Sequence, residues 1–238
     1  MSSILEQLVS PTPPGPAVTD KSKNKVPEAT ATAKTPTSAP RIELSDGDYV
    51  DVVFYHGDND PDAARALPWF WNRLMADDLL KLYYPAETDR SFCTFVKMVS
   101  SPGIRVLFVV VKDSSGDVKD FMGLATWEPM QFGPSTLGHA GFIFLKDFWH
   151  RDITLRAGRR IMQAWFEEFP QPLDIAVGII AKDNILANRY VQQLGWTKVG
   201  ILPNCQQYGG KPSDAVIWQV THNGWDDIKS QSQSAEIK

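Results

Sequence analysis

The stretch GFIFLKDFWHRDITLRAGRRIM, at positions 141 to 162, runs from an apolar strand pattern through a turn into an amphipathic helix. Its beginning, within HAGFIFL at 139–145, is typical of a strand, and apolar positions recur at helical spacing over about 153–169. The next apolar run, LDIAVGIIA at 173–181, predicts a second strand. A strand, a helix and a strand in this order predict a parallel pair of strands in an α/β fold.

The rest of the pattern places this unit inside a mostly antiparallel sheet. Further strands are expected at 50–55, 105–111 and 120–130, and near 197–202 and 215–220. The turn DSSGD at 113–117 indicates a hairpin. Expected helices are one through Ala66 to Leu74, short ones at about 76–84 and 87–98, and one at about 184–194. We therefore expect an α/β (α+β) domain over 48–226, with about seven strands, one parallel splayed pair and flanking helices.

Composition favours a single globular domain and excludes several classes of protein. The 238 residues are 43% hydrophobic and 22% charged, and the net charge of -4 gives no general reason to bind nucleic acid or an anionic membrane. Cys93 and Cys205 lie in no cluster of metal ligands, so neither a disulfide framework nor a metal site is indicated. There is no phosphate-binding loop, GxGxxG, HExxH or serine nucleophile elbow. Without an apolar run of about 18 residues or a signal-peptide pattern, we expect a cytoplasmic protein.

The two ends of the chain differ from the middle. Residues 1–40 carry seven prolines among Ser, Thr, Ala and Lys and no aromatic residue, so we expect a disordered arm. The alternative is a docking arm, because Ile4, Leu5, Leu8 and Val9 form a short apolar cluster that could seat on a larger assembly. Residues 227–238 are expected to form a polar tail.

Two local strings match a known family. Phe148 and Trp149 form an aromatic-Trp pair ahead of a short loop, and DNILANRYVQQLGW at 183–196 places Asn184 before a helix and Gly195-Trp196 after it. In these strings and in its order of elements, the chain resembles the GNAT N-acetyltransferase superfamily, in particular its ribosomal-protein alanine acetyltransferase branch. The resemblance covers roughly three quarters of the chain.

This resemblance implies an acetyl-CoA site between the two parallel strands. In the family, pantetheine pairs with the first of these strands, here ending at Phe144 and Leu145, and an Asn equivalent to Asn184 bonds the pantetheine arm. The pyrophosphate is held by backbone N–H groups at the start of the following helix, where unpaired donors and the helix dipole favour an anion. The matching positions in this chain are Arg151, Asp152, Ile153 and Thr154. As an alternative, Asp183-Asn184 is an ordinary turn and N-cap.

The pyrophosphate loop departs from the family pattern. Asp152 and Thr154 stand where the family usually has Gly and Gly or Ala, so we describe this loop as degenerate. An Asp there would repel a diphosphate, and Asp152 could instead cap the helix and occupy the donors that CoA requires. Arg151, Arg156, Arg159 and Arg160 restore positive charge along the helix, although a solvated helix face would carry the same residues.

Catalytic groups are less clearly marked. Many relatives use a Tyr as general acid four residues before the Gly of the Gly-aromatic pair, but that position is Val191 here. Tyr190 is its neighbour, and on a helix its side chain should point about 100° away. Glu128 and His139 are candidates for the base that deprotonates an amine, since they lie on strands beside the expected cleft. Each could equally be a surface or turn residue.

Two functions follow from these observations. The first is acetyl transfer from acetyl-CoA to an unidentified amine, with no metal required. The second is an inactive GNAT-like structural or interaction module, for example a phage virion component, tethered to an assembly by its N-terminal arm. A ligand binder that uses the same cleft cannot be separated from these by sequence.

Overall fold

A computed structural model describes residues 41–44, 46–55, 61–80, 91–169 and 171–236. The arm expected over 1–40 lies outside these residues, as do positions 81–84 of the short helix expected at 76–84. Within the described residues no helix is long and apolar enough to cross a membrane.

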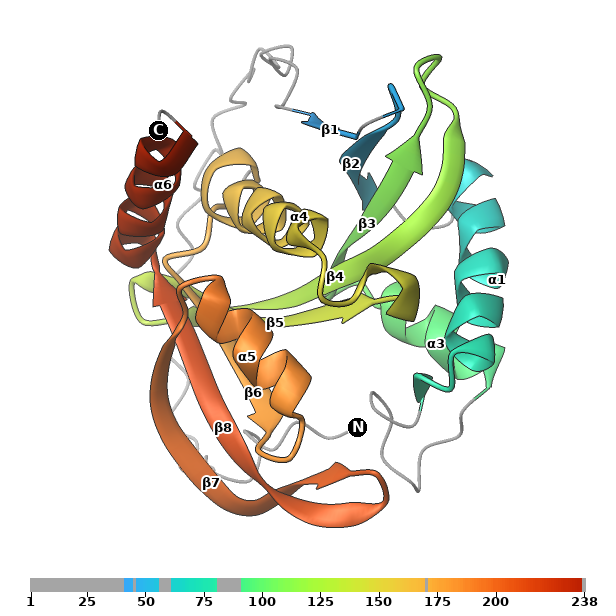
Figure 1. Cartoon of the computed structure of the whole chain (residues 1–238). Helices are drawn as coiled ribbons and strands as arrows, with labels where there is room; N and C mark the ends of the chain where they lie inside the picture. The colour runs from blue at the N-terminus through green and yellow to red at the C-terminus, as the bar shows by residue number, and fades with distance from the viewer. Residues whose placement is uncertain (1–40, 45, 56–60, 81–90, 170, 237–238) are drawn as a thin grey trace, which may run out of the picture. The chain divides into compact units, whose positions relative to one another are not determined.

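Eight strands of the described chain form one sheet in the order β1-β2-β3-β4-β5-β6-β8-β7, as Figure 1 shows. All neighbouring strands are antiparallel except β5 and β6, which are parallel as predicted. The strands are β1 (Ile42–Glu43), β2 (Tyr49–Tyr55), β3 (Arg105–Lys112), β4 (Val118–Phe132), β5 (Ser135–Phe144), β6 (Ile175–Ala181), β7 (Thr197–Tyr208) and β8 (Lys211–Thr221). The strand beyond the expected seven is the two-residue β1, which pairs with β2 and starts before the expected domain boundary at residue 48.

Helices cover this sheet on both faces (Figure 1). The helical elements are α1 (Pro61–Ala76), α3 (Phe92–Val99), the 3-10 helix η2 (Lys146–Phe148), α4 (Asp152–Gln163), the π-helix η3 (Ala164–Glu168), α5 (Ile185–Gln193) and α6 (His222–Glu236). The alternation of side chains along β3 separates the two layers. Leu107 and Val109 pack in the cluster that contains α4, whereas Val106 and Phe108 pack in the cluster that contains α1 and α3.

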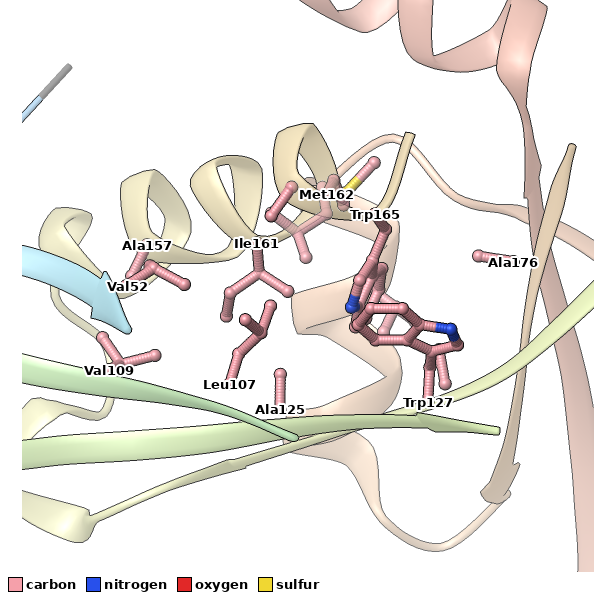
Figure 2. Packing of buried hydrophobic residues seen from close by; sticks show 14 of the residues in the cluster. Val52, Leu107, Val109, Ala125, Trp127, Ala157, Ile161, Met162, Trp165 and Ala176 are labelled. Carbon is pink, nitrogen blue, oxygen red and sulfur yellow. The ribbon is translucent and has the colours of Figure 1, made fainter. Parts of the chain in front are cut away.

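The layer under α4 is the larger of the two clusters. Figure 2 shows Ala157 and Ile161 of α4 lying over Val52 and Leu107. Each fully buried aliphatic side chain of this kind stabilises the fold by roughly 1.5–3 kcal/mol before the entropy of ordering is subtracted. The cluster continues toward β6, where the Trp127 ring lies 6.1 Å from the ring of Trp165 in η3.

The helix boundaries differ from the predicted ones where capping decides them. The helix α3 begins at Phe92 rather than near residue 87, because the Ser91 side chain accepts from the Thr94 backbone N–H at 3.2 Å and caps it. The range 227–238, expected as a polar tail, is helical as far as Glu236. This helix is held to the domain by Trp225, which is buried and donates from Nε1 to Glu167 at 2.7 Å.

Candidate functional site

The parallel strands β5 and β6 open away from each other. They pair at three positions only, Leu137 with Ile175, Gly138 with Ala176 and His139 with Val177. Beyond that row β5 stays paired with β4 as far as Phe144, and β6 stays paired with β8 as far as Ala181. The facing edges of 140–144 and 178–181 therefore have no strand between them, and their backbone groups can accept a ligand with amide groups. We call this space the β5–β6 opening.

Aromatic side chains line the opening on the side of α4 and α5. The Tyr190 ring lies 5.6 Å from Phe142 and 5.5 Å from Phe144, and the Trp196 ring lies 6.1 Å from Phe142. A Cβ at Gly178 would come within 3.3 Å of the Trp196 ring, so this glycine leaves room for the indole. These rings give the opening an apolar wall.

The Tyr190 ring is part of this wall. Val191, the position at which the family pattern places the general acid, is buried at 3% exposure in the core cluster. The Tyr190 hydroxyl donates to the Thr154 carbonyl of α4 at 3.1 Å. Burial raises the pKa of Tyr190 well above its usual value, so the hydroxyl remains protonated. Tyr190 therefore packs α5 on α4, with its ring against Phe142 and Phe144.

The start of α4 is not capped by Asp152. Its N-cap is Arg151, which has no side-chain capping bond, and Asp152 is the exposed first residue of the helix. Thr154 is buried, and its hydroxyl donates to the Phe148 carbonyl rather than entering the loop. The alternative in which Asp152 occupies the helix's first N–H groups is therefore wrong. The Thr154 N–H donates to the Arg151 carbonyl at 3.1 Å, so the N–H groups of Asp152 and Ile153 are the ones suited to an anion.

The loop before α4 contains a turn of the kind that glycine usually makes. His150 has a φ of 59°, in the left-handed region that favours glycine. The family pattern places its glycines at the positions of Asp152 and Thr154, so it does not point to His150.

Of the four arginines considered along α4, Arg160 is buried and binds the Glu168 carboxylate at 2.9 Å, so it is a core ion pair. Arg151 and Arg156 are exposed and contribute the positive charge near the loop.

Asn184 is the N-cap of α5, as its alternative interpretation predicted. Its Oδ1 accepts from the Ala187 backbone N–H at 3.2 Å. This bond uses only the acceptor of the amide, so the Nδ2 donor is left for a second partner. The capping role and the predicted contact with a pantetheine carbonyl are therefore compatible.

The two backbone groups predicted to bind pantetheine, at Phe144 and Leu145, already form hydrogen bonds within the protein. The Phe144 carbonyl accepts from Trp149 Nε1 at 2.8 Å, and the Leu145 N–H donates to the Met122 carbonyl at 3.0 Å. The Leu145 side chain lies in the other core layer, with α1 and α3. The free edge of β5 is accordingly the segment 140–143 rather than the strand end.

Glu128 and His139 are direct cross-strand partners in the β4–β5 register. Their neighbours Trp127 and Ala140 pack under α4, so alternation points Glu128 and His139 to the opposite face of the sheet. His139 also stands in the last paired row before the β5–β6 opening. Desolvation lowers the pKa of His139 below its usual value, and the Glu128 carboxylate opposes this shift. A neutral imidazole at neutral pH is suited to accept a proton.

The structure thus places the candidates on the two faces of the sheet around β5. Tyr190, Thr154 and Asn184 belong to the α4–α5 side, and Glu128 with His139 belongs to the other side. Sequence reasoning named all five residues but missed Phe142 and Gly158. Gly158 carries a readable signal, since a glycine in mid-helix costs about 1 kcal/mol and needs a packing reason.

Comparisons with known proteins agree with this geometry. A family model described as an acetyltransferase (GNAT) domain matches residues 42–197. A search of curated proteins found no match.

Solved structures with a similar fold include spermidine N-acetyltransferase SpeG from Vibrio cholerae in complex with CoA and spermine, at 13% identity and a TM-score of 0.56, with 74% of this chain and 97% of that chain covered. A chimera of that enzyme with hSSAT gives 14% identity, a TM-score of 0.56 and coverages of 75% and 98%. The dodecameric form of the enzyme in an intermediate state gives 13% identity and a TM-score of 0.54, with 74% of this chain and 95% of that chain covered. At this level of identity the similarity shows a common fold. Because the family model spans well over half of its length, the chain belongs to the acetyltransferase (GNAT) domain family.

Proposed function

We propose that this protein transfers an acetyl group from acetyl-CoA to an amine. The observation that carries the proposal is the β5–β6 opening, where two strand edges separate after His139 and Val177 and leave backbone groups for a ligand. The family match and the fold shared with amine acetyltransferases support the same reaction class.

The residues around the opening fit the parts of acetyl-CoA. The edge of β5 at 140–143 offers backbone partners to the pantetheine amides, and the Asn184 Nδ2 offers a further donor. The N–H groups at Asp152 and Ile153, together with the exposed Arg151, suit the pyrophosphate. The apolar wall excludes water from the thioester end, which strengthens electrostatic interactions there.

The two faces then divide the proton transfers. His139, oriented beside Glu128, takes a proton from the amine as its nitrogen forms the bond to the acetyl carbon. The bond between that carbon and sulfur breaks, and the sulfur takes a proton from the Tyr190 hydroxyl, which solvent later restores. In the described arrangement this hydroxyl donates to Thr154, so the transfer requires it to rotate toward the opening.

A second candidate function is a GNAT-like module without catalysis, and the exposed Asp152 carboxylate at the start of α4 favours it. Its negative charge opposes a diphosphate at the site where the family binds one. In that case the arm over 1–40 would tether the domain to a partner.

Calorimetric titration with acetyl-CoA separates the two functions. Micromolar binding, followed by thiol release with spermidine or with a peptide that begins with alanine, is the expected result. These two amines represent the similar solved enzymes and the alanine acetyltransferase branch. Absence of binding to the full chain would refute acetyl transfer and leave the module as the better account.

A further inference from the structure

Arg73 in the last turn of α1, and Asp77 just after it, bind the connection between β5 and α4. We call residues 145–151 the β5–α4 loop. Arg73 Nη2 donates to the Asp147 carboxylate. Asp77, in the turn directly after α1, accepts from the Lys146 backbone N–H at 3.1 Å. Two adjacent residues of the loop are therefore bound by side chains from α1 and from the turn that follows it.

Arg73 is itself held in place before it reaches the loop. Its Nη1 lies 3.7 Å from the Asp120 carboxylate, and its guanidinium lies 5.4 Å from the Trp69 ring centre. Its side chain is 27% exposed. An isolated surface ion pair contributes little because it must immobilise two long side chains. The contacts to Asp120 and Trp69 have already restricted Arg73, so its bond to Asp147 costs less ordering entropy.

The far end of the β5–α4 loop is fixed by other bonds. Trp149 Nε1 donates to the Phe144 carbonyl at 2.8 Å, and the Thr154 hydroxyl donates to the Phe148 carbonyl. Between these anchors and α4 lies His150, with its left-handed φ of 59°. A non-glycine residue keeps such a conformation only where the surrounding structure determines it. The bonds from Arg73 and Asp77 to residues 147 and 146 help to hold His150 in this conformation.

We propose that Arg73 and Asp77 are positioning residues for the anion site at the start of α4. Neither residue belongs to the opening or to α4, so each acts through the β5–α4 loop. This inference rests on the proposed function, because the anion is the pyrophosphate of acetyl-CoA. The bonds from Arg73 and Asp77 orient the β5–α4 loop and therefore the N–H groups of the first turn of α4. This orientation decides how well those groups converge on one anion.

The test is a double-mutant cycle on acetyl-CoA affinity with Arg73→Ala, Asp147→Ala and the double variant. Each single change should raise the Kd for acetyl-CoA roughly threefold to tenfold, and the double variant should be no weaker than the weaker single variant. Asp77→Ala should act in the same direction, and Arg73→Lys should recover part of the loss. The KM for the amine should not change, because Arg73 and Asp77 bind Asp120, Asp147 and the Lys146 N–H rather than Glu128 or His139.

A matched control removes a surface ion pair elsewhere. Lys119 Nζ binds the Asp48 carboxylate at 2.6 Å beside the β3–β4 hairpin, so Lys119→Ala should leave the acetyl-CoA Kd unchanged. Amide hydrogen exchange without ligand gives an independent readout, in which Arg73→Ala should reduce protection over 146–154 and Lys119→Ala should not.

The outcomes separate the two ideas. Wild-type binding of acetyl-CoA with unchanged Kd in Arg73→Ala would overturn the positioning role and leave the proposed function standing. Unchanged exchange over 146–154 in Arg73→Ala would overturn it as well. Failure of the wild-type chain to bind acetyl-CoA would overturn the proposed function and this inference together.

Discussion

A substitution at Gly158 tests whether Tyr190 is fixed against α4 as described. A Cβ at this position would come 2.1 Å from the Tyr190 hydroxyl oxygen and 2.9 Å and 3.0 Å from the two terminal methyl carbons of Leu194. A contact below 3.0 Å forces a neighbouring atom to shift, and Leu194 is buried at 1% exposure. Gly158→Ala must therefore displace the Tyr190 hydroxyl and crowd the Leu194 methyl groups.

The net effect combines terms of opposite sign. Replacing a mid-helix glycine by alanine stabilises a helix by about 1 kcal/mol, whereas forcing an extra carbon into a packed site costs about 1–3 kcal/mol. Displacing the hydroxyl also loses its hydrogen bond to Thr154, worth about 1 kcal/mol. We expect Gly158→Ala to lower the free energy of unfolding by about 1–3 kcal/mol, which corresponds to a fall in Tm of roughly 2–12 °C.

The double variant Gly158→Ala with Tyr190→Phe removes the clashing oxygen while the ring stays in place. Urea unfolding of the four proteins in this cycle should show the double variant about 1 kcal/mol more stable than the sum of the single effects. Gly103→Ala is the control, because no atom lies within 4 Å of its added Cβ. Additive single effects, or equal losses in Gly158→Ala and Gly103→Ala, would refute the described contact between α4 and α5.

Three further perturbations test charges at and around the site. The kcat/KM for acetyl transfer should fall as pH drops through the lowered pKa of His139, and Glu128→Gln should move this limb to still lower pH because its carboxylate raises that pKa; a limb that stays in place would remove His139 as the base. Burial raises the pKa of Glu167, but its bonds from Lys229 and Trp225 outweigh burial and lower it, so the stability advantage of wild type over Glu167→Gln should be present at pH 7 and shrink below about pH 4.5. A pH-independent difference in Tm would contradict this. Asp152→Gly should lower the Kd for acetyl-CoA roughly threefold to tenfold in titration, and a weaker Kd would show that the carboxylate does not face the pyrophosphate.

The fold could be predicted largely because the strand-helix-strand unit has strong periodicity. The apolar run at 139–145 and the one at 173–181 correspond to β5 and β6, and their parallel pairing follows from the helix between them. The shortness of that pairing could not be read from sequence. It depends on where β4 and β8 hold each strand, which is set by long-range register rather than local pattern.

The sequence predicts which residues belong to the candidate site better than it predicts how they are arranged. On an ideal helix the Tyr190 side chain points about 100° from that of Val191, the position that the family pattern favours. The actual direction is set by the gap at Gly158, which admits the hydroxyl between α4 and α5. Likewise, Glu128 and His139 were named separately, and only the β4–β5 register shows that they are opposite each other.

The strand β5 alone connects the two halves of the proposed chemistry. Its residues Phe142 and Phe144 face Tyr190 and α4, while His139, three residues before Phe142, faces the other layer. Odd separation along a strand places side chains on opposite faces, so a base and an acid near one strand approach the opening from two sides. Under the proposed function, the amine and acetyl-CoA then need not share one entrance, because the proposed base and acid lie on different faces of the sheet. A slip of β5 by one residue would exchange the faces and place the imidazole against the apolar wall, so the ten-residue pairing of β4 with β5 maintains the arrangement.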